Sequence, residues 1–272
     1  MTPEGSTVKV RTGITLSYAA TGDPSGSAVV LFPGPTDSWR SYAPVLDQFP
    51  SSVRAIAVSQ RGHGDSDKPP TGYRVEDFAA DVPPLLDALE LERPVLAGHS
   101  GSCLVVRRVA IEHPERVAGL VLEGSPTTLR GNAGLTGFVE SVVSNLQDPI
   151  DPSFARSFVA DTSSEQLPPS LVDELAGELM KVPARVWKEM FAGLLAYDDL
   201  AEIERINAPT LLLWGDADGL VDRAMQATLA ERIRGSELLV YPGGGHTPRW
   251  EDPTRFVLDV ATFAERALQR PP

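Results

Sequence analysis

The chain has 272 residues and a formal net charge of −13 at pH 7, and 42% of its residues are hydrophobic. This length is enough for one large α/β domain with an insertion or for two small domains. The acidic balance excludes a basic face for nucleic-acid phosphates, and no apolar run approaches the ~18–20 residues that a membrane span needs.

Cysteine content and the N-terminal residues bear on the compartment. The single cysteine, Cys103, cannot form a disulfide within the chain. The first residues lack the apolar stretch of a secretory signal. We therefore expect a soluble, cytoplasmic protein whose partner is a small molecule, not a nucleic acid or a membrane. The oligomeric state stays open.

Short apolar runs bounded by Pro, Gly or Ser alternate with helical patterns along most of the chain. Such runs are typical of strands buried on both faces of a parallel sheet, and the first two, around Thr12-Gly13, predict a hairpin. The alternation predicts an α/β protein with a doubly wound, mostly parallel, eight-stranded sheet. The expected strands are 8–10, 14–18, 28–32, 53–58, 95–97, 117–122, 210–214 and 237–241, and the expected helices are 75–89, 104–112, 222–233 and 253–268.

One of these helical patterns contains a proline pair. Pro83 and Pro84 fall inside the 75–89 pattern, and proline removes a backbone donor and clashes with the preceding turn. We expect two short helical pieces there instead of one helix.

Residues 126–201 interrupt the alternation. They contain no convincing strand, and this length exceeds what a crossover between two strands needs. We expect a helical cap, or lid, over a core formed by residues 1–125 and 202–272. The amphipathic segments of the expected cap are 135–146, 152–160, 169–180 and 183–197.

The stretch LAGHSGSCLVV, at 96–106, has the pattern of a nucleophile elbow. Ser100 follows a predicted strand and precedes a predicted helix, which is the context that G-x-S-x-G requires. The tight turn forces the serine into strained backbone angles and exposes its Oγ. Ser102 replaces the last glycine of the motif and strains the close packing of strand and helix. An ordinary loop is the alternative.

A serine nucleophile needs a base that is oriented by a carboxylate. Later segments offer both, in the order Ser, Asp, His. The stretch PTLLLWGDADGLVD, at 209–222, is a buried strand followed by acids, and His246 lies on a Gly-rich loop after another strand. The other histidines have plain structural explanations, in a turn, in the elbow and at a helix end: His63, His99 and His113.

Across nearly its whole length the chain resembles the α/β-hydrolase fold superfamily, in its capped, serine-nucleophile, esterase- and lactonase-like branch. The resemblance implies that the acid is Asp218 of Gly-x-x-Asp, with Asp216 as the runner-up and Asp222 as a helix cap. Ser100 excludes the relatives that attack with aspartate, haloalkane dehalogenases and epoxide hydrolases. The matching stretches are PGPTDSWRSY, QRGHGDSDKP, LAGHSGSC, RVAIEHPERVAGLVLEGSP, APTLLLWGDADGLV and GGGHTPRWEDP.

The oxyanion hole departs from the family pattern. One donor is the N–H of Gly101, the residue after the nucleophile. The resemblance places the other donor in the loop after the third strand, at Pro35, which has no N–H. Three alternatives follow: Gly34 or Thr36 donates instead, the Thr36 hydroxyl or a water substitutes, or the hole is impaired. We favour a displaced donor.

Large apolar side chains near the elbow and in the cap indicate an apolar or mixed substrate. Glu123 ends the strand of GLVLEG and either faces the site or is a solvated strand-end acid. The pocket candidates are Trp39, Glu123, Phe138, Trp187 and Phe191.

Together these features predict a hydrolase that needs no metal and no cofactor. Its expected reaction is cleavage of a small carboxylic ester or lactone, apolar or of mixed polarity, through an acyl-enzyme. Two alternatives stay open. One is a ligand-binding or slow-turnover signalling protein that retains the triad; the other is a C–C hydrolase, perhydrolase or non-hydrolytic tailoring enzyme on the same fold.

Overall fold

The computed structural model describes residues 4–163 and 167–269, so the outer ends of the expected core segments and residues 164–166 of the expected cap lie outside it. Within the described residues, eight strands form one sheet in the order β1-β2-β4-β3-β5-β6-β7-β8. Pairing is antiparallel at β1-β2-β4 and parallel elsewhere, which confirms the predicted, mostly parallel sheet. The strands are β1 (Ser6–Lys9), β2 (Thr15–Thr21), β3 (Ser27–Phe32), β4 (Val53–Val58), β5 (Val95–His99), β6 (Gly119–Glu123), β7 (Thr210–Gly215) and β8 (Glu237–Tyr241).

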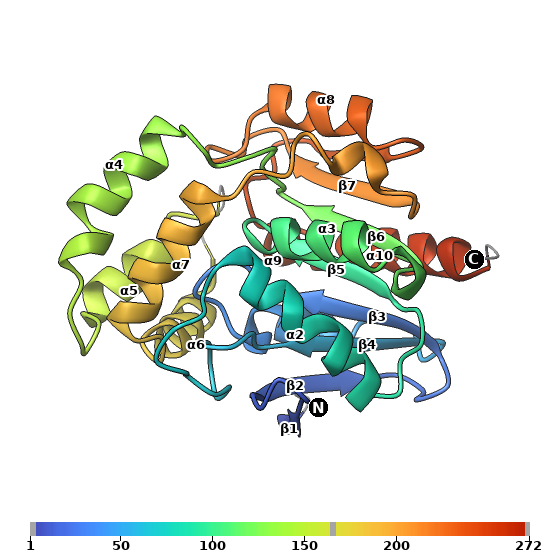
Figure 1. Ribbon diagram of the computed structural model, residues 1–272, viewed down its shortest axis with the longest axis horizontal. Coiled ribbons are helices and arrows are strands. Elements are labelled where there is room, and N and C mark those ends of the chain that lie inside the picture. The colour runs from blue at the N-terminus through green and yellow to red at the C-terminus, as the bar shows by residue number, and fades with distance from the viewer. Residues whose placement is uncertain (1–3, 164–166, 270–272) are drawn as a thin grey trace.

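The parallel strands bring their carboxyl ends to one edge of the sheet (Figure 1). The register sets Phe32 of β3 opposite Gly98 of β5, and His99 opposite Glu123 of β6. Glu123 in turn lies opposite Leu213 of β7. The segments that follow these strands therefore start at one level, where ligands bind in open α/β sheets.

Helices cover both faces of the sheet, with α2 and α3 in front and α10 behind in Figure 1. Alternate side chains of one strand serve the two cores: Val30 packs in the core under α2 and α3, and Val29 in the core under α1 and α10. The flanking helices are α1 (Ala43–Leu46), α2 (Val75–Ala88), α3 (Ser102–Glu112), α8 (Arg223–Arg232), α9 (Pro248–Glu251) and α10 (Pro253–Leu268), and 3₁₀ helices lie at Trp39–Tyr42, Pro114–Arg116, Val143–Asn145 and Ile203–Arg205.

A further group of helices lies beyond the carboxyl ends of the strands, on the left of Figure 1. The chain leaves the sheet after β6 and returns to it at β7, as the sequence pattern predicts. Between them it forms α4 (Ala133–Ser141), α5 (Pro152–Ala160), α6 (Pro169–Leu179) and α7 (Ala184–Ala196).

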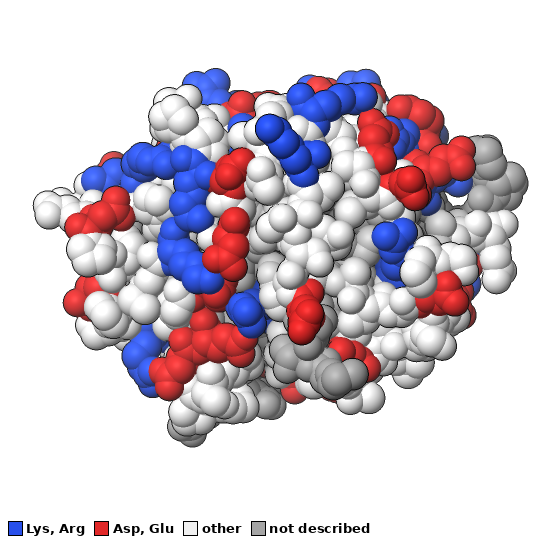
Figure 2. Space-filling model, turned by 90° about the horizontal axis from the view of Figure 1, so that it is seen from below, with Lys and Arg blue, Asp and Glu red and all other residues white. Residues whose placement is uncertain are grey.

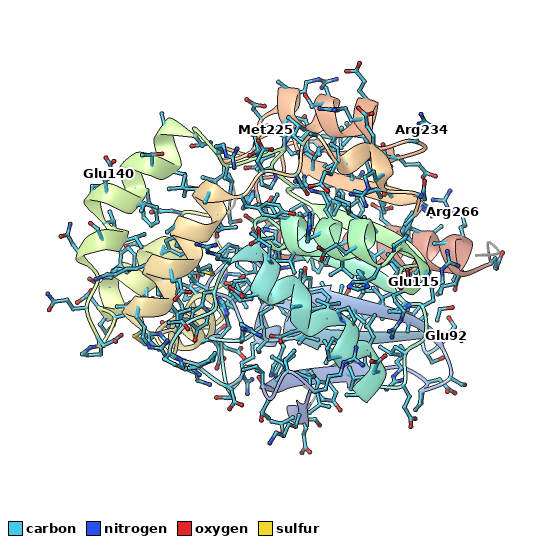
Figure 3. All side chains as sticks on the ribbon, viewed as in Figure 1. Glu92, Glu115, Glu140, Met225, Arg234 and Arg266 are labelled. Atoms are coloured by element: carbon cyan, nitrogen blue, oxygen red, sulfur yellow. The ribbon has the colours of Figure 1, made fainter. Side chains whose placement is uncertain are left out.

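Ion pairs join these helices to the sheet side of the molecule. Arg40 Nη1 lies 3.1 Å from the Glu174 carboxylate of α6, and Lys181 Nζ lies 2.9 Å from Asp65. Figure 2 shows acidic and basic side chains next to one another on the lower face. In Figure 3 labelled charged residues lie on the outer rim of the molecule: Glu92, Glu115, Glu140, Arg234 and Arg266. In the described part of the chain no helix has the length and apolar character to cross a membrane.

The proline pair does not break α2, so the prediction of two helical pieces is wrong. One helix runs from Val75 to Ala88 with Pro83 and Pro84 inside it. Buried side chains anchor the helix on both sides of the pair, and this packing outweighs the missing backbone donors. The anchoring side chains are Phe78, Ala79, Val82, Leu85 and Leu86.

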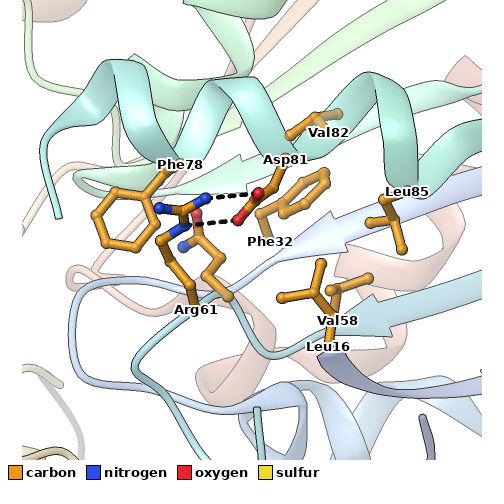
Figure 4. A pocket seen from close by; sticks show the side chains of 9 residues that line it. Leu16, Phe32, Val58, Arg61, Phe78, Asp81, Val82 and Leu85 are labelled. Carbon is orange, nitrogen blue, oxygen red and sulfur yellow. Dashed lines mark hydrogen bonds and ion pairs between the residues drawn. The ribbon is translucent and has the colours of Figure 1, made fainter. Parts of the chain in front are cut away.

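An ion pair adds to this anchoring. The Arg61 guanidinium donates to both oxygens of Asp81 at 2.6 Å, between Phe78 and Phe32 (Figure 4). Both charged side chains are largely buried. The pair fixes the middle of α2, just before the prolines, to the segment that follows β4.

Removal of one partner of this pair is expected to cost more stability than removal of both. Arg61→Met leaves the Asp81 carboxylate buried without its counter-ion, which costs about 3–5 kcal/mol of unfolding free energy. Combining Arg61→Met with Asp81→Leu removes the uncompensated charge and should recover part of that loss. Urea unfolding followed by circular dichroism measures both. If the double variant is the less stable of the two, the argument from buried charge is wrong.

Candidate active site

Ser100 lies in a sharp turn between β5 and α3. Its φ of 53° is in the left-handed region, which a residue with a Cβ adopts only when its surroundings hold it there. The Ser100 N–H donates to the Glu123 carbonyl at 2.8 Å. A Cβ on Gly98 would lie 2.7 Å from the Ser102 carbonyl oxygen, so glycine permits the close approach of strand and helix. These contacts hold the serine in its turn.

Ser102 takes the place of the motif's last glycine and makes hydrogen bonds that glycine lacks. Its hydroxyl donates to the Pro33 carbonyl at 2.6 Å and accepts from Nε2 of Gln60 at 2.8 Å. The side chain is buried. It ties the loop after β3 to the first turn of α3.

His246 and Asp218 meet at the same edge of the sheet. Nδ1 of His246, on the loop between β8 and α9, lies 2.7 Å from Oδ2 of Asp218, and both side chains are almost fully buried. The other oxygen of Asp218 accepts the N–H groups of Leu220 and Val221 at 2.8 and 3.0 Å. The carboxylate is thereby fixed, and its bond to Nδ1 leaves Nε2 as the nitrogen that can accept a proton.

The neighbouring acids have other partners. Asp216 accepts the N–H of Gly243 at 2.6 Å. Asp222 accepts the N–H of Met225 at 2.9 Å and caps α8. Among the described residues, Asp218 is the acid of this turn that bonds His246.

His99, for which the sequence suggested a structural role as the elbow spacer, also lines the pocket beside Ser100. Its Nε2 lies 3.0 Å from the His246 carbonyl, and since a carbonyl only accepts, Nε2 carries the proton. The centroids of the His99 and His246 imidazole rings are 4.8 Å apart. Burial, with Arg249 and His246 nearby, holds the pKa of His99 well below its usual range, so the ring is neutral. No local pattern signals this contact between segments far apart in sequence.

The loop after β3 makes a tight turn against the serine. The Asp37 N–H donates to the Gly34 carbonyl at 3.1 Å, and Thr36 has φ 75°, as in a type II turn with Pro35 at its second position. A Cβ on Gly34 would lie 3.6 Å from Cβ of Ser100. Gly34 therefore lies next to Ser100, whereas Thr36 is fully buried.

A pocket of about 560 Å³ includes Ser100 and His246 in its wall, together with Gly34, Pro35 and Gly101. Aromatic rings from the helices between β6 and β7 form much of the rest. The ring centroid of Phe138 lies 5.9 Å from that of Phe158 and 5.8 Å from that of Phe191. Among the described residues, no Lys or Arg lines the pocket. Its other polar residues are Asp37, His99, Asn132, Ser157, Asp161 and Thr162.

The structure corrects part of the expected pocket. Trp39 packs in the core under α1 and α10, and Trp187 is fully buried and stacks on Phe191 at 5.6 Å. Glu123 is 1% exposed and pairs with Arg249 at 3.2 Å, so it neither lines the pocket nor meets solvent. Sequence indicates that these residues are large or charged, but not which way each points. The expected residues found in the wall are Phe138 and Phe191.

Comparison with known proteins identifies the family. Residues 27–253 match the model of the alpha/beta hydrolase fold, so the chain belongs to the α/β-hydrolase family and is an enzyme of that fold. The 2-hydroxymuconate semialdehyde hydrolase of Pseudomonas sp. strain CF600 is 30% identical, over 86% of this chain and 84% of that protein. The non-heme chloroperoxidase of Streptomyces lividans is 29% identical, over 88% and 92%.

Among solved structures, Est816, described as an N-acyl homoserine lactone degrading enzyme, matches with a TM-score of 0.80 and 26% identity. The match covers 95% of this chain and all (100%) of that one. The names of these relatives describe different reactions, so membership of the family does not by itself fix the reaction of this chain.

Gly34→Ala is expected to reduce hydrolysis of p-nitrophenyl butyrate by about 100-fold or more. The new Cβ would lie 2.6 Å from Nδ1 of His99, whose ring is held by its bond to the His246 carbonyl. The loop or the ring must therefore shift, and displacements of about 1 Å in an active site can cost ~10²-fold in rate.

Gly137→Ala, within α4, is the matched control, because apart from its chain neighbours and the backbone of its own helix no described atom lies within 4 Å of a Cβ there. Alanine inside a helix should add about 0.5–1 kcal/mol of stability and leave the rate unchanged. Full activity in Gly34→Ala would contradict the close contact between this loop and the elbow.

Proposed function

We propose that this hydrolase uses Ser100 as nucleophile to cleave a small, uncharged carboxylic ester or lactone. The observation that carries the proposal is the His246–Asp218 hydrogen bond of 2.7 Å, in a pocket whose wall also includes the strained Ser100. A serine, a base and an orienting carboxylate are the groups that acyl transfer needs.

The reaction runs through an acyl-enzyme. His246 Nε2 takes the Ser100 proton as Oγ bonds to the carbonyl carbon, and the C=O π electrons move to the oxygen. The intermediate collapses, the C–O bond to the alcohol breaks, and His246 protonates the leaving oxygen. Water then loses a proton to His246 as its oxygen bonds to the acyl carbon. The bond between the acyl carbon and Oγ breaks, His246 returns the proton to Ser100 Oγ, and the acid leaves. Asp218 holds the imidazole and stabilises its charged form.

Backbone donors stabilise the oxyanion in this proposal. The N–H of Gly101 lies at the start of α3, where the first N–H groups lack intrahelical acceptors. The second donor is the N–H of Gly34, because Gly34 is the residue of its loop that lies next to Ser100 and lines the pocket. The missing N–H of Pro35 favours one second candidate, a ligand-binding protein with slow turnover.

Residues 126–201 act as the cap over a core of residues 1–125 and 202–272. Support comes from α4, α5 and α7, which follow β6 and contribute Phe138, Phe158 and Phe191 to the pocket wall. The cap thus supplies the apolar surface for the substrate, whereas the loops at the sheet edge supply the polar groups of catalysis.

The charge of the wall indicates an uncharged substrate. Asp37 and Asp161 line the pocket, and no described Lys or Arg does. A carboxylate on the substrate would lose its hydration without gaining a cation. This distinguishes the proposed substrate from the succinate derivative in the name of another relative, 28% identical to this chain, the 2-(acetamidomethylene)succinate hydrolase of Mesorhizobium japonicum.

Serine-dependent turnover tests the proposal directly. The protein is mixed with excess p-nitrophenyl acetate or butyrate, and nitrophenolate release is followed from the first milliseconds. We expect steady turnover that falls by ~10³-fold or more in Ser100→Ala and in His246→Ala. Retained turnover in both variants would disprove the triad mechanism. Saturable binding of the ester without product would support the ligand-binding candidate.

A matched pair of esters tests the charge of the substrate. We expect kcat/KM for p-nitrophenyl butyrate to exceed that for the mono-p-nitrophenyl ester of succinic acid by about tenfold or more, because Asp161 repels the second carboxylate and no described cation of the wall binds it. Asp161→Asn should narrow the ratio while leaving the butyrate value unchanged. A ratio near one in the native protein would show that the wall does not select by charge.

A further inference from the structure

A buried ionic cluster of Arg249, Glu123 and Asp37 lies next to Ser100 and His246, and its side chains take no part in the acyl-transfer steps. Arg249 is fully buried, three residues after His246. Its Nη1 lies 3.2 Å from Oε1 of Glu123, and its Nη2 lies 3.2 Å from Oδ2 of Asp37. The guanidinium also donates to the Ser41 hydroxyl, from Nη2 at 2.7 Å and from Nε at 3.2 Å.

Glu123 connects this cluster to both the nucleophile and the histidine loop. Its carbonyl accepts the Ser100 N–H at 2.8 Å, which helps to hold the left-handed turn. Its Oε1 accepts the backbone N–H of Arg249 at 3.1 Å, and its Oε2 accepts from Tyr42 Oη at 3.4 Å. One residue thus bonds both the elbow and the segment that follows His246.

Asp37 connects the cluster to the loop after β3. Its backbone N–H closes the Gly34 turn at 3.1 Å, and its carboxylate receives both Arg249 and the Ser41 hydroxyl, the latter at 2.9 Å. Burial raises the pKa of the Asp37 carboxyl to about 6, against the opposing charge of Arg249. Burial also raises the pKa of Glu123, again against Arg249.

We propose that Arg249 and Glu123 are positioning residues that hold the nucleophile, histidine and oxyanion loops in register and set the charge around His246. This inference rests on the proposed function. The cluster touches no reacting atom in the mechanism; it acts through Ser100, His246 and Gly34.

Because Glu123 and Arg249 carry opposite charges, their substitutions are expected to shift the pH dependence of activity in opposite directions. The charged and titratable groups around His246 are Asp218, His99, Glu123 and Asp37, and Arg249 pairs with the last two. A carboxylate favours the imidazolium form of His246, and a guanidinium disfavours it. Loss of the Glu123 charge is therefore expected to move the acidic limb of the pH–activity profile to lower pH. Loss of the Arg249 charge is expected to move it to higher pH.

The test is the pH dependence of two reactions of Ser100. One is kcat/KM for p-nitrophenyl butyrate. The other is phosphorylation by diethyl p-nitrophenyl phosphate, in which Oγ bonds to phosphorus, nitrophenolate leaves, and the serine proton goes to His246. We expect the acidic limb of both to move by ~0.5 pH unit or more, downward in Glu123→Gln and upward in Arg249→Met. Arg249→Lys keeps the charge and should keep the limb, while kcat falls and KM stays near the native value.

Controls separate positioning from general damage. Asp81→Asn disrupts another buried ion pair, so it should lower stability without moving the limb. If Arg249→Met does not fold, Glu123→Gln combined with Arg249→Met restores the native net charge of the cluster, because one positive and one negative charge are removed together, and it should return the acidic limb toward its native position. Limbs that stay fixed, or that move the same way in both single variants, overturn the proposal. Absence of Ser100-dependent phosphorylation in the native protein overturns the proposed function, and the positioning role with it.

Discussion

The left-handed turn at Ser100 is the constraint on which the rest of the site depends. A side chain at φ 53° costs on the order of 1–3 kcal/mol, so the surrounding structure has to hold it there. The hydrogen bond to Glu123 does this from β6, and Gly98 allows α3 to pass close to β5. The parallel pairing of β5 with β6 sets the first of these contacts, because it places His99 opposite Glu123.

The same edge of the sheet explains why polar side chains, not only close packing, hold the loops together. Loops that leave parallel strands at one level carry backbone groups without sheet partners. Ser102 satisfies one of them, the Pro33 carbonyl, and Glu123 satisfies the Arg249 N–H. Asp218 in turn accepts two N–H groups of its own turn. Side chains proposed to act in the reaction and side chains that hold the loops therefore lie within a few residues of one another in the sequence.

Local patterns in the sequence were sufficient for the sheet and for the helices between β6 and β7, because both are encoded in hydrophobic periodicity. A short motif singled out Ser100, whereas the family resemblance, not a local pattern, selected Asp218 from the three acids of its turn. The prediction of a break at the proline pair of α2 is wrong because tertiary packing overrides local propensity. Long-range contacts could not be predicted from the sequence. His99 bonds the carbonyl of His246, 147 positions away, and the Arg249 N–H bonds Glu123, 126 positions away. No periodicity encodes which buried polar atoms meet.

Three buried or largely buried arginines of this chain join irregular segments to one another. Arg61 joins α2 to the segment after β4 and also donates to the Gly72 carbonyl. Arg107, fully buried on α3, donates to the Pro126 and Thr127 carbonyls after β6 and pairs with Asp199 before β7, so it binds both ends of the inserted helices. Arg249 does the same for the loops around Ser100. Buried ion pairs contribute little net stability compared with apolar packing, but a guanidinium has five donors in one rigid plane. Such a group fixes several loops relative to one another at once. Apolar contacts of equal area would leave the same loops free to slide past one another.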